Sequence, residues 1–267
     1  VAGQFLHRAG SYEDAAQRLL ATHYAYAEAL LSEGDYEGAV AEFIAADYYS
    51  DASIRVKKTQ YIWAEALLSA GDYTGAIEKF EALADYSDSE ERIQEAHYAY
   101  AEALLSEGNY IIAVAEFLAA GDYKDAAERV PQTRYARAEA LLEAGDYDAA
   151  IEIFTALGDY GDAAQRIPQT RYERAEALLE AGDIDSALVE FVLLGNYGDA
   201  VERVGEIHYT QAEGSLAESD IDNALAEFAL AGDYKDAPER IQAIHYAEAE
   251  ELLAAGDAAG AAAEFEA

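Results

Sequence analysis

A repeat of 37 residues runs through the whole chain and constrains its fold more than any other feature. The string Ala-Glu-Ala-Leu-Leu recurs at this interval, and its five full and two weaker copies begin at Ala27, Ala64, Ala101, Ala138, Ala175, Ala212 and Ala249. No insertion or deletion separates the copies. Such a period is typical of repeat architectures, in which each unit packs only on its neighbours. We therefore expect a single solenoid over residues 1–267, made of seven units and an eight-residue overlap.

Each unit carries the signals of two helices joined by a turn. In the fourth copy, residues 135–142 place apolar side chains three and four positions apart, which predicts one buried helix face. Gly145 is suited to end that helix, and Asp146 is suited to cap the next one. Residues 150–154 supply the apolar stripe of a second, shorter helix. Because the sequence has no strand pattern, the prediction is an all-α fold.

A third helix start precedes the next long helix. Asp162 and Gln165 form the pattern of a capping box, in which the aspartate side chain accepts a backbone hydrogen bond. Pro131, Pro168 and Gly205 share one phase shortly after such a start. Since proline breaks a straight helix, we expect copies three to five to divide there into a short helix and the long one. The predicted unit is helix–turn–helix with a short helical lead-in.

The inter-helix turn resembles that of the tetratricopeptide repeat in the run Gly145-Asp146-Tyr147-x-x-Ala150-Ile151-x-x-Phe154. Upstream, Tyr135-x-x-Ala138-x-x-Leu141 is similar to the first helix of that family. The unit differs from the family pattern in length, because it has 37 residues where the family usually has about 34. The resemblance implies a right-handed superhelix whose first helices line a concave groove that binds peptides.

Two series on the first helix are candidates for lining such a groove. The tyrosines are Tyr24, Tyr61, Tyr98, Tyr135, Tyr172, Tyr209 and Tyr246. The glutamates are Glu28, Glu65, Glu102, Glu139, Glu176, Glu213 and Glu250. A line of like charges in a groove would favour a cationic partner. The alternatives are that each ring packs between helices with its hydroxyl on a polar partner, and that the glutamates form a solvated face.

An Asp-x-x-x-Arg pair is predicted to lie at the junction between repeats. Six of these pairs are Asp51 with Arg55, Asp88 with Arg92, Asp125 with Arg129, Asp162 with Arg166, Asp199 with Arg203, and Asp236 with Arg240. The chain has only 17 basic residues, so an arginine that returns in every copy indicates a fixed structural partner. A bidentate contact with a neighbouring repeat's carboxylate or with a helix C-terminus would suit its planar guanidinium.

Composition and repetition exclude several functions. The formal net charge of −37 argues against nucleic acid and anionic lipid as partners, and no apolar run is long enough to insert in a membrane. Without cysteine there is no thiol nucleophile or thiolate metal site. The histidines that share one phase, His23, His97, His208 and His245, lie in different repeats, too far apart to hold one ion. Because each acid is copied in every repeat, we expect no catalytic, cofactor or metal site.

The two ends of the chain have the same phase. Ala2 and Leu6 lie 37 residues before Ala39 and Phe43, which belong to a predicted second helix. The last residues, around Phe265, have the same position in the repeat. The chain is therefore expected to begin and end inside a second helix. The leading hypothesis is a non-catalytic scaffold for protein–protein interaction or head-to-tail self-assembly, as a segment of a longer array. The alternatives are a peptide-binding module with an acidic, tyrosine-lined groove for basic segments, and an engineered or consensus repeat without native function. The sequence leaves the compartment open.

Overall fold

The computed structural model describes residues 2–84 and 86–266, with side chains from residue 14 onward. These residues form helices and turns without a strand, as the periodicity predicts. The first helices of the repeats are α1 (Ala2–Glu33), α3 (Ala52–Ala70), α5 (Ser89–Ser106), α7 (Ala126–Glu143), α9 (Ala163–Glu180), α11 (Ala200–Ala217) and α13 (Ala237–Ala254). The second helices are α2 (Tyr36–Ala45), α4 (Tyr73–Leu83), α6 (Tyr110–Ala120), α8 (Tyr147–Leu157), α10 (Ile184–Leu194), α12 (Ile221–Ala231) and α14 (Ala258–Glu266).

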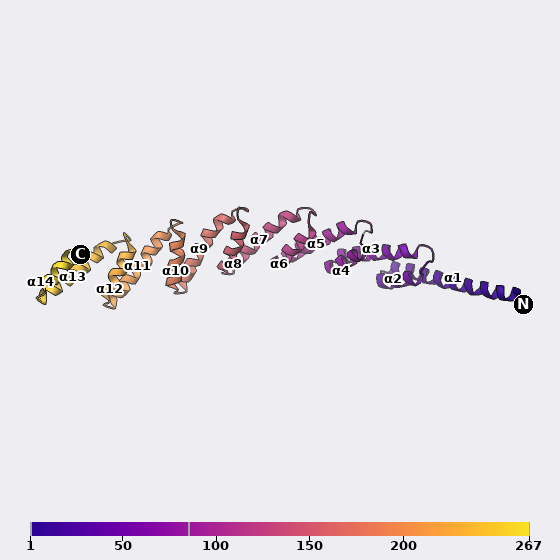
Figure 1. Ribbon diagram of the computed structural model, residues 1–267, viewed down its shortest axis with the longest axis horizontal. Coiled ribbons are helices and arrows are strands. Elements are labelled where there is room, and N and C mark those ends of the chain that lie inside the picture. The colour runs from indigo at the N-terminus through magenta and orange to yellow at the C-terminus, as the bar shows by residue number, and fades with distance from the viewer. Residues whose placement is uncertain (1, 85, 267) are drawn as a thin grey trace. The chain divides into compact units, whose positions relative to one another are not determined.

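Contacts divide the chain into two compact units, Val1–Ala136 and Arg137–Ala267. In each unit a long helix is followed by a turn and a shorter helix that folds back on it (Figure 1). In the first unit α1 packs on α2, α3 on α4 and α5 on α6, while α2 and α4 also pack on the helix that follows them. In the second unit α9, α11 and α13 pack on the helix before and on the helix after. Each unit is therefore a solenoid of helix pairs.

The core of each repeat is small and regular. In the first pair, Ala27 of α1 and Ala39 and Phe43 of α2 are fully buried. Alanine at the crossing point lets the helices approach closely, and the phenylalanine fills the space beside it. The same phenylalanine is buried in six repeats, at Phe43, Phe80, Phe117, Phe154, Phe191 and Phe228.

The turns between paired helices have the chemistry that the sequence predicts. Gly145 follows α7 with a φ of 79°, a left-handed conformation that glycine adopts without a steric cost. Asp146 then accepts a hydrogen bond from the backbone N–H of Ala149 at 3.2 Å. Ser219 stands where the other copies have glycine, and it adopts the same left-handed conformation with a φ of 64°. The predictions for Gly145 and Asp146 are confirmed.

The break expected at Pro131, Pro168 and Gly205 is wrong. These residues lie inside α7, α9 and α11, each of which is one continuous helix that includes the expected lead-in. A proline removes one hydrogen bond from the helix, but the helix is held on both sides of it. In α7, Val130 before the proline and Thr133 after it are both buried. Packing thus outweighs the local cost, and the lead-in becomes the first turns of the long helix.

The capping box expected at Asp162 is also wrong in its contacts. Asp162 is the N-cap residue of α9, but its carboxylate accepts no capping hydrogen bond. The same is true of Asp51, Asp88, Asp199 and Asp236 at the equivalent helices. The carboxylates of these four residues are engaged by a neighbouring repeat instead, as described below.

The first helix, α1, is longer than the first helices of the later repeats. α1 continues from Ala2 to Glu33 through the positions at which later repeats turn. The last described helix, α14, is the shorter helix of the last pair. None of the described helices combines the length and the apolar character that crossing a bilayer requires.

Candidate functional site

At five junctions a hydrogen bond joins one repeat to the next through the tyrosine and aspartate series. The Tyr24 hydroxyl on α1 donates at 2.6 Å to the carboxylate of Asp51, the N-cap residue of α3. The same bond, between residues 27 positions apart, joins Tyr61 to Asp88, Tyr98 to Asp125, Tyr172 to Asp199 and Tyr209 to Asp236 at 2.5–2.6 Å. The aspartate therefore marks a helix start and at the same time receives a tyrosine from the preceding repeat.

The tyrosine rings are half-buried and edge-packed. The Tyr24 ring lies 5.3 Å from that of Phe43 and 5.7 Å from that of Tyr49, in edge-to-face arrangements. Tyr209 repeats this geometry in the second unit, at 5.3 Å from Phe228 and 5.9 Å from Tyr234. Such pairs favour a fixed ring orientation, which directs the hydroxyl toward the aspartate.

The hydrogen bond shifts the titration of both partners. Donation to Asp125 and burial raise the pKa of Tyr98 to about 12, and donation to Asp199 does the same for Tyr172. Conversely, accepting a hydrogen bond from tyrosine lowers the pKa of the Asp88 and Asp125 carboxyls below the ordinary value. The contact is therefore formed by a neutral phenol and an ionised carboxylate.

The junction arginine binds the glutamate series of the preceding repeat. The Arg203 Nε and Nη2 atoms donate to the two Glu176 carboxylate oxygens at 2.8 Å each. Arg166 makes the same paired contact with Glu139 at 2.6–2.9 Å. The remaining pairs, again 27 residues apart, are Arg55 with Glu28, Arg92 with Glu65, Arg129 with Glu102 and Arg240 with Glu213. The partner that the structure shows is the neighbouring repeat's carboxylate.

The same guanidinium also lies against the buried phenylalanine of the preceding repeat. The Arg129 Cζ atom lies 5.3 Å from the centroid of the Phe117 ring, and the Arg203 Cζ atom lies 5.9 Å from the centroid of the Phe191 ring. Because the glutamate comes from the first helix and the phenylalanine from the second, one arginine contacts both helices of the repeat before it. The Glu176 carboxylate raises the pKa of Arg203 above its ordinary value, so the guanidinium stays charged.

The glutamate line is consequently not a row of free negative charges. Its six members from Glu28 to Glu213 are half-buried, and each has an arginine beside it. The last repeat differs, since Glu250 is exposed and the Tyr246 side chain is 59% exposed. At the other end, Arg18 is paired with Asp14 on its own helix, and its side chain is 80% exposed. A groove-lining role for the two series stays a prediction.

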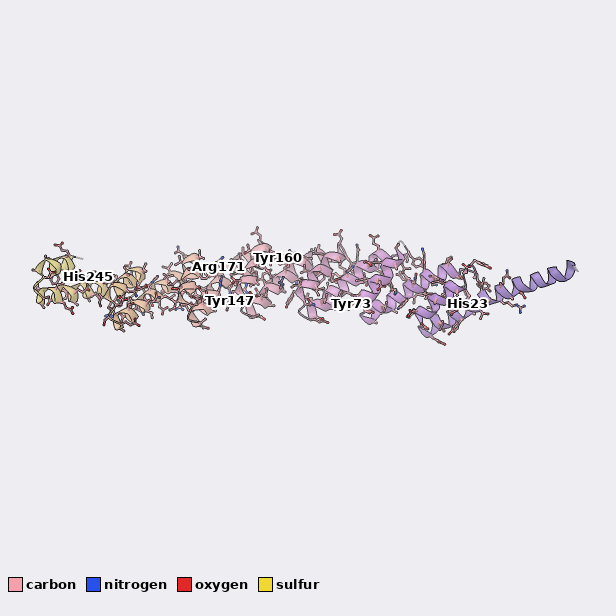
Figure 2. All side chains as sticks on the ribbon, turned by 60° about the horizontal axis from the view of Figure 1, so that its bottom comes forward. His23, Tyr73, Tyr147, Tyr160, Arg171 and His245 are labelled. Carbon is pink, nitrogen blue, oxygen red and sulfur yellow. The ribbon has the colours of Figure 1, made fainter. Side chains whose placement is uncertain are left out.

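A second ionic series was missed at the sequence level. His23 Nδ1 lies 2.6 Å from the Glu42 carboxylate of the paired helix, and the contact recurs between His97 and Glu116, His208 and Glu227, and His245 and Glu264 (Figure 2). Arg171 replaces the histidine in the fifth copy and pairs with Glu190 at 3.1 Å. The signal in the sequence is a glutamate that follows the histidine or arginine by 19 residues in five copies. Two copies depart from it, with Gln60 before Lys79 and Arg134 before Ile153.

The first unit also carries an aromatic strip, which we define as Tyr36, Trp63, Tyr73 and Tyr100. Tyr36 stacks on Trp63 of the next repeat with centroids 6.5 Å apart, and Tyr73 stacks on Tyr100 at 5.6 Å. The Lys79 ammonium lies 4.3 Å from the Trp63 ring centroid. All four rings are half-buried, so part of each is open to solvent.

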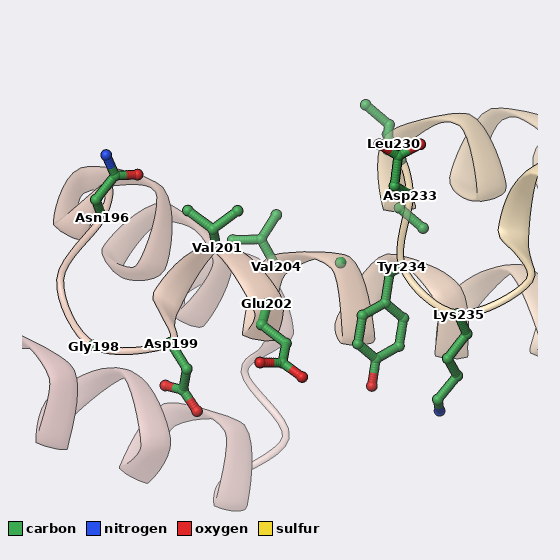
Figure 3. Close-up of a pocket in the computed structure, with 13 residues that line it drawn as sticks. Asn196, Gly198, Asp199, Val201, Glu202, Val204, Leu230, Asp233, Tyr234 and Lys235 are labelled. Atoms are coloured by element: carbon green, nitrogen blue, oxygen red, sulfur yellow. The ribbon is translucent and has the colours of Figure 1, made fainter.

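A surface hollow lies in the second unit, between the turns that follow α10 and α12. It has a volume of about 980 Å³ and is lined by residues that include Val201, Glu202, Leu230 and Lys235 (Figure 3). Gly205 forms part of its floor, beside Tyr234. The labelled residues are a mixture of apolar, polar and charged ones, without a nucleophile held by a base among these lining residues.

Comparison with known proteins identifies related sequences and folds. A family model described as tetratricopeptide repeat matches residues 61–120 and 135–201, and a second model with that description matches residues 20–43. No curated protein sequence matches the chain.

Several solved structures are similar at low identity. The C-terminal part of a repeat-containing protein from Cytophaga hutchinsonii is 15% identical, with 91% of this chain and 93% of that chain covered and a TM-score of 0.24. A protein from Parabacteroides merdae is 12% identical, with 93% and 91% covered and a TM-score of 0.22. A Rap protein complexed with competence and sporulation factor is 13% identical, with 91% and 72% covered and a TM-score of 0.20.

Proposed function

Because this chain belongs to the tetratricopeptide repeat family, whose domains are generally protein–protein interaction modules, we propose that it is a non-catalytic scaffold that associates end to end with copies of itself. The proposed interface is one more copy of the junction already described. The last repeat of one molecule supplies Tyr246 and Glu250, and the first helix of the next supplies Asp14 and Arg18.

The observation that carries this proposal is the exposure of these four side chains. Tyr246 and Glu250 are exposed, whereas the tyrosines and glutamates at the same phase in the six preceding repeats are half-buried. Asp14 and Arg18 are exposed as well, with each other as neighbours. One end thus offers a hydroxyl donor and a carboxylate, and the other offers a carboxylate and a guanidinium donor. Such a heterologous contact adds molecules in a row. In a longer chain, the next repeat of the same chain would use the same face.

A charge exchange tests this interface. Light scattering at increasing concentration should show species heavier than the 28.9 kDa chain. Glu250→Arg alone and Arg18→Glu alone should each reduce association, and the double variant should restore it because the ion pair is rebuilt with its charges exchanged. Glu78→Arg changes the net charge equally at an exposed site away from the ends and serves as the control. A constant mass of one chain, or a double variant no better than the single ones, would contradict the proposal.

A second candidate function is binding of a basic segment on the aromatic strip. The Lys79 ammonium over Trp63 supports it, because this contact shows that a strip ring accepts a cation on its face. The net charge of −37 would draw a lysine- or arginine-rich peptide toward the chain. The strip differs from the predicted groove residues, whose glutamates are paired with arginine in the first six repeats.

The single tryptophan of the chain makes this candidate easy to test. A basic peptide should change Trp63 fluorescence at low salt and less at high salt, because screening weakens the attraction. Tyr100→Ala removes a ring of the strip and should weaken binding, while Tyr48→Ala removes a ring that is 74% exposed elsewhere. Binding that ignores salt, or that both variants weaken equally, would rule this candidate out.

A further inference from the structure

The last helix pair brings one histidine and two glutamates together. His245 and Glu248 lie one turn apart on α13, and Glu264 comes from α14. The ligand atoms of the three side chains all lie within 4.8 Å of one another. His245 Nδ1 is 2.6 Å from the Glu264 Oε2 atom. One nitrogen and two oxygens therefore converge from two elements whose backbones are held by helix packing.

Comparison among the repeats shows that this set is peculiar to the last one. The histidine–glutamate pair occurs in three other repeats, but the residue three positions after the histidine is Tyr26, Tyr100 or Gln211 there. Only in the last repeat is the residue three positions after the histidine a carboxylate, Glu248. Among the residues with described side chains, no other group of three has ligand atoms this close together.

Two of the three side chains, those of Glu248 and Glu264, border a surface hollow beside the cluster. A surface hollow of about 350 Å³ is lined by Glu248, Glu251 and Glu264, together with Leu252 and Ala255. The side chains of His245 and Glu264 are 22% and 31% exposed, so they are partly shielded from solvent but reachable.

We propose that His245 Nδ1 and one carboxylate oxygen each of Glu248 and Glu264 bind a single zinc-like divalent transition-metal ion, with water completing its coordination. An imidazole with two carboxylates suits Zn²⁺, whereas Ca²⁺ and Mg²⁺ prefer oxygen ligands throughout. Zinc ligands lie about 2.0–2.2 Å from the ion, so the hydrogen-bonded nitrogen and oxygen would separate to about 3.3 Å around it. The ion would tie α13 to α14. This site is independent of the end-to-end interface proposed above.

Calorimetric titration of the metal-free full chain with Zn²⁺ tests the site. Mg²⁺ is present in excess throughout. It screens the surface carboxylates, so that non-specific binding of Zn²⁺ to them is not measured. We expect one Zn²⁺ per chain, with an affinity that Glu248→Gln and His245→Gln each lower by more than about tenfold, since even loss of a supporting contact costs that much. Co²⁺ should give a visible absorption band that these variants abolish.

Two variants of the preceding repeat are matched controls. His208→Gln removes a histidine with the same glutamate contact but without a third ligand, so zinc affinity should stay unchanged. Gln211→Glu supplies the missing carboxylate beside His208 and Glu227, so the stoichiometry should rise from one ion to two. Circular dichroism confirms that each variant is helical. Absence of zinc binding above the magnesium background, an unchanged affinity in Glu248→Gln, or one ion in Gln211→Glu would overturn the proposal.

Discussion

Arg203 shows how one side chain can hold two repeats together. Its guanidinium contacts both carboxylate oxygens of Glu176, lies over the Phe191 ring and reaches Glu206 on its own helix. A lysine could not make the same contacts, because its ammonium is not planar and cannot bind a carboxylate in a fork or stack flat on a ring. The recurrence of arginine at this phase follows from this geometry.

Removing this arginine should therefore destabilise the chain. Arg203→Ala leaves the half-buried Glu176 carboxylate without its partner, and we expect a loss of about 1–3 kcal/mol in the free energy of unfolding. Arg134→Ala is the control, because Arg134 is exposed on α7 outside the junction series, and it should change stability by less than about 0.5 kcal/mol. Urea unfolding followed by circular dichroism measures both. Equal losses in the two variants would show that the junction contact contributes nothing.

The sequence predicted that the Asp-x-x-x-Arg pairs would lie between repeats, but not which groups they would contact. The contact of Arg55 with Glu28 depends on how α3 is rotated against α1. Local patterns do not contain that rotation. Likewise, Asp51 looked like a capping residue, because the Tyr24 hydroxyl that takes its carboxylate is 27 residues away. The pairing of His23 with Glu42, in contrast, could have been suspected from the 19-residue spacing that recurs in the copies with His97, His208 and His245.

At the level of the helix, predictions from local chemistry were right at the turn after α7 and wrong inside the helix itself. Gly145 and Asp146 form the turn that their conformational and capping preferences favour. Pro131 was expected to break a helix on the same local grounds, yet α7 continues through it. The buried stripe of α7, from Ala126 to Ala138, runs past the proline without interruption. A local rule could not weigh one lost hydrogen bond against that stripe.

Two glycines of α11 separate helix propensity from packing in a single element. Alanine is favoured over glycine by about 1 kcal/mol inside a helix, so Gly214→Ala, where a Cβ would meet nothing within 4 Å, should stabilise the chain by up to about that amount. At Gly205 a Cβ would lie 2.9 Å from the Tyr234 Cβ and 3.2 Å from the Ala231 carbonyl oxygen. Gly205→Ala should therefore destabilise by about 1–3 kcal/mol. Thermal unfolding of both variants decides the matter, and a shift of the same sign in both would refute the close contact.

For the chain as a whole, the pairing of side chains between repeats changes the meaning of its net charge of −37. The glutamates of the series form ion pairs with arginines, and the aspartates accept hydrogen bonds from tyrosine hydroxyls. The excess charge consequently lies on other exposed acids. Because the same contact recurs from repeat to repeat, a condition that breaks one such contact acts on all of them together.

Alkaline pH is such a condition. Donation to Asp125 and Asp199 raises the pKa of Tyr98 and Tyr172 from 10.0 to about 12, which means that the folded state holds the phenol proton more tightly than the unfolded chain does. The stabilisation that the tyrosine–aspartate hydrogen bonds contribute to the folded state is fully present below pH 10, and it is lost as the pH rises from 10 toward 12. Tyr24 and Tyr209 shift in the same direction, so the losses should add across repeats.

The urea midpoint measured at pH 8, 10 and 11 should therefore fall steeply above pH 10. A Tyr98→Phe, Tyr172→Phe double variant should be less stable than the original chain at pH 8, because two hydrogen bonds are missing, but its midpoint should fall less between pH 10 and 11. Tyr48→Phe is the control, since Tyr48 is 74% exposed and its loss should leave the slope unchanged.

Repulsion among newly ionised tyrosines also destabilises at high pH, but it acts on the control and on the double variant alike. An equal slope in all three chains would mean that repulsion alone causes the alkaline loss and that the tyrosine–aspartate contacts do not hold the repeats together.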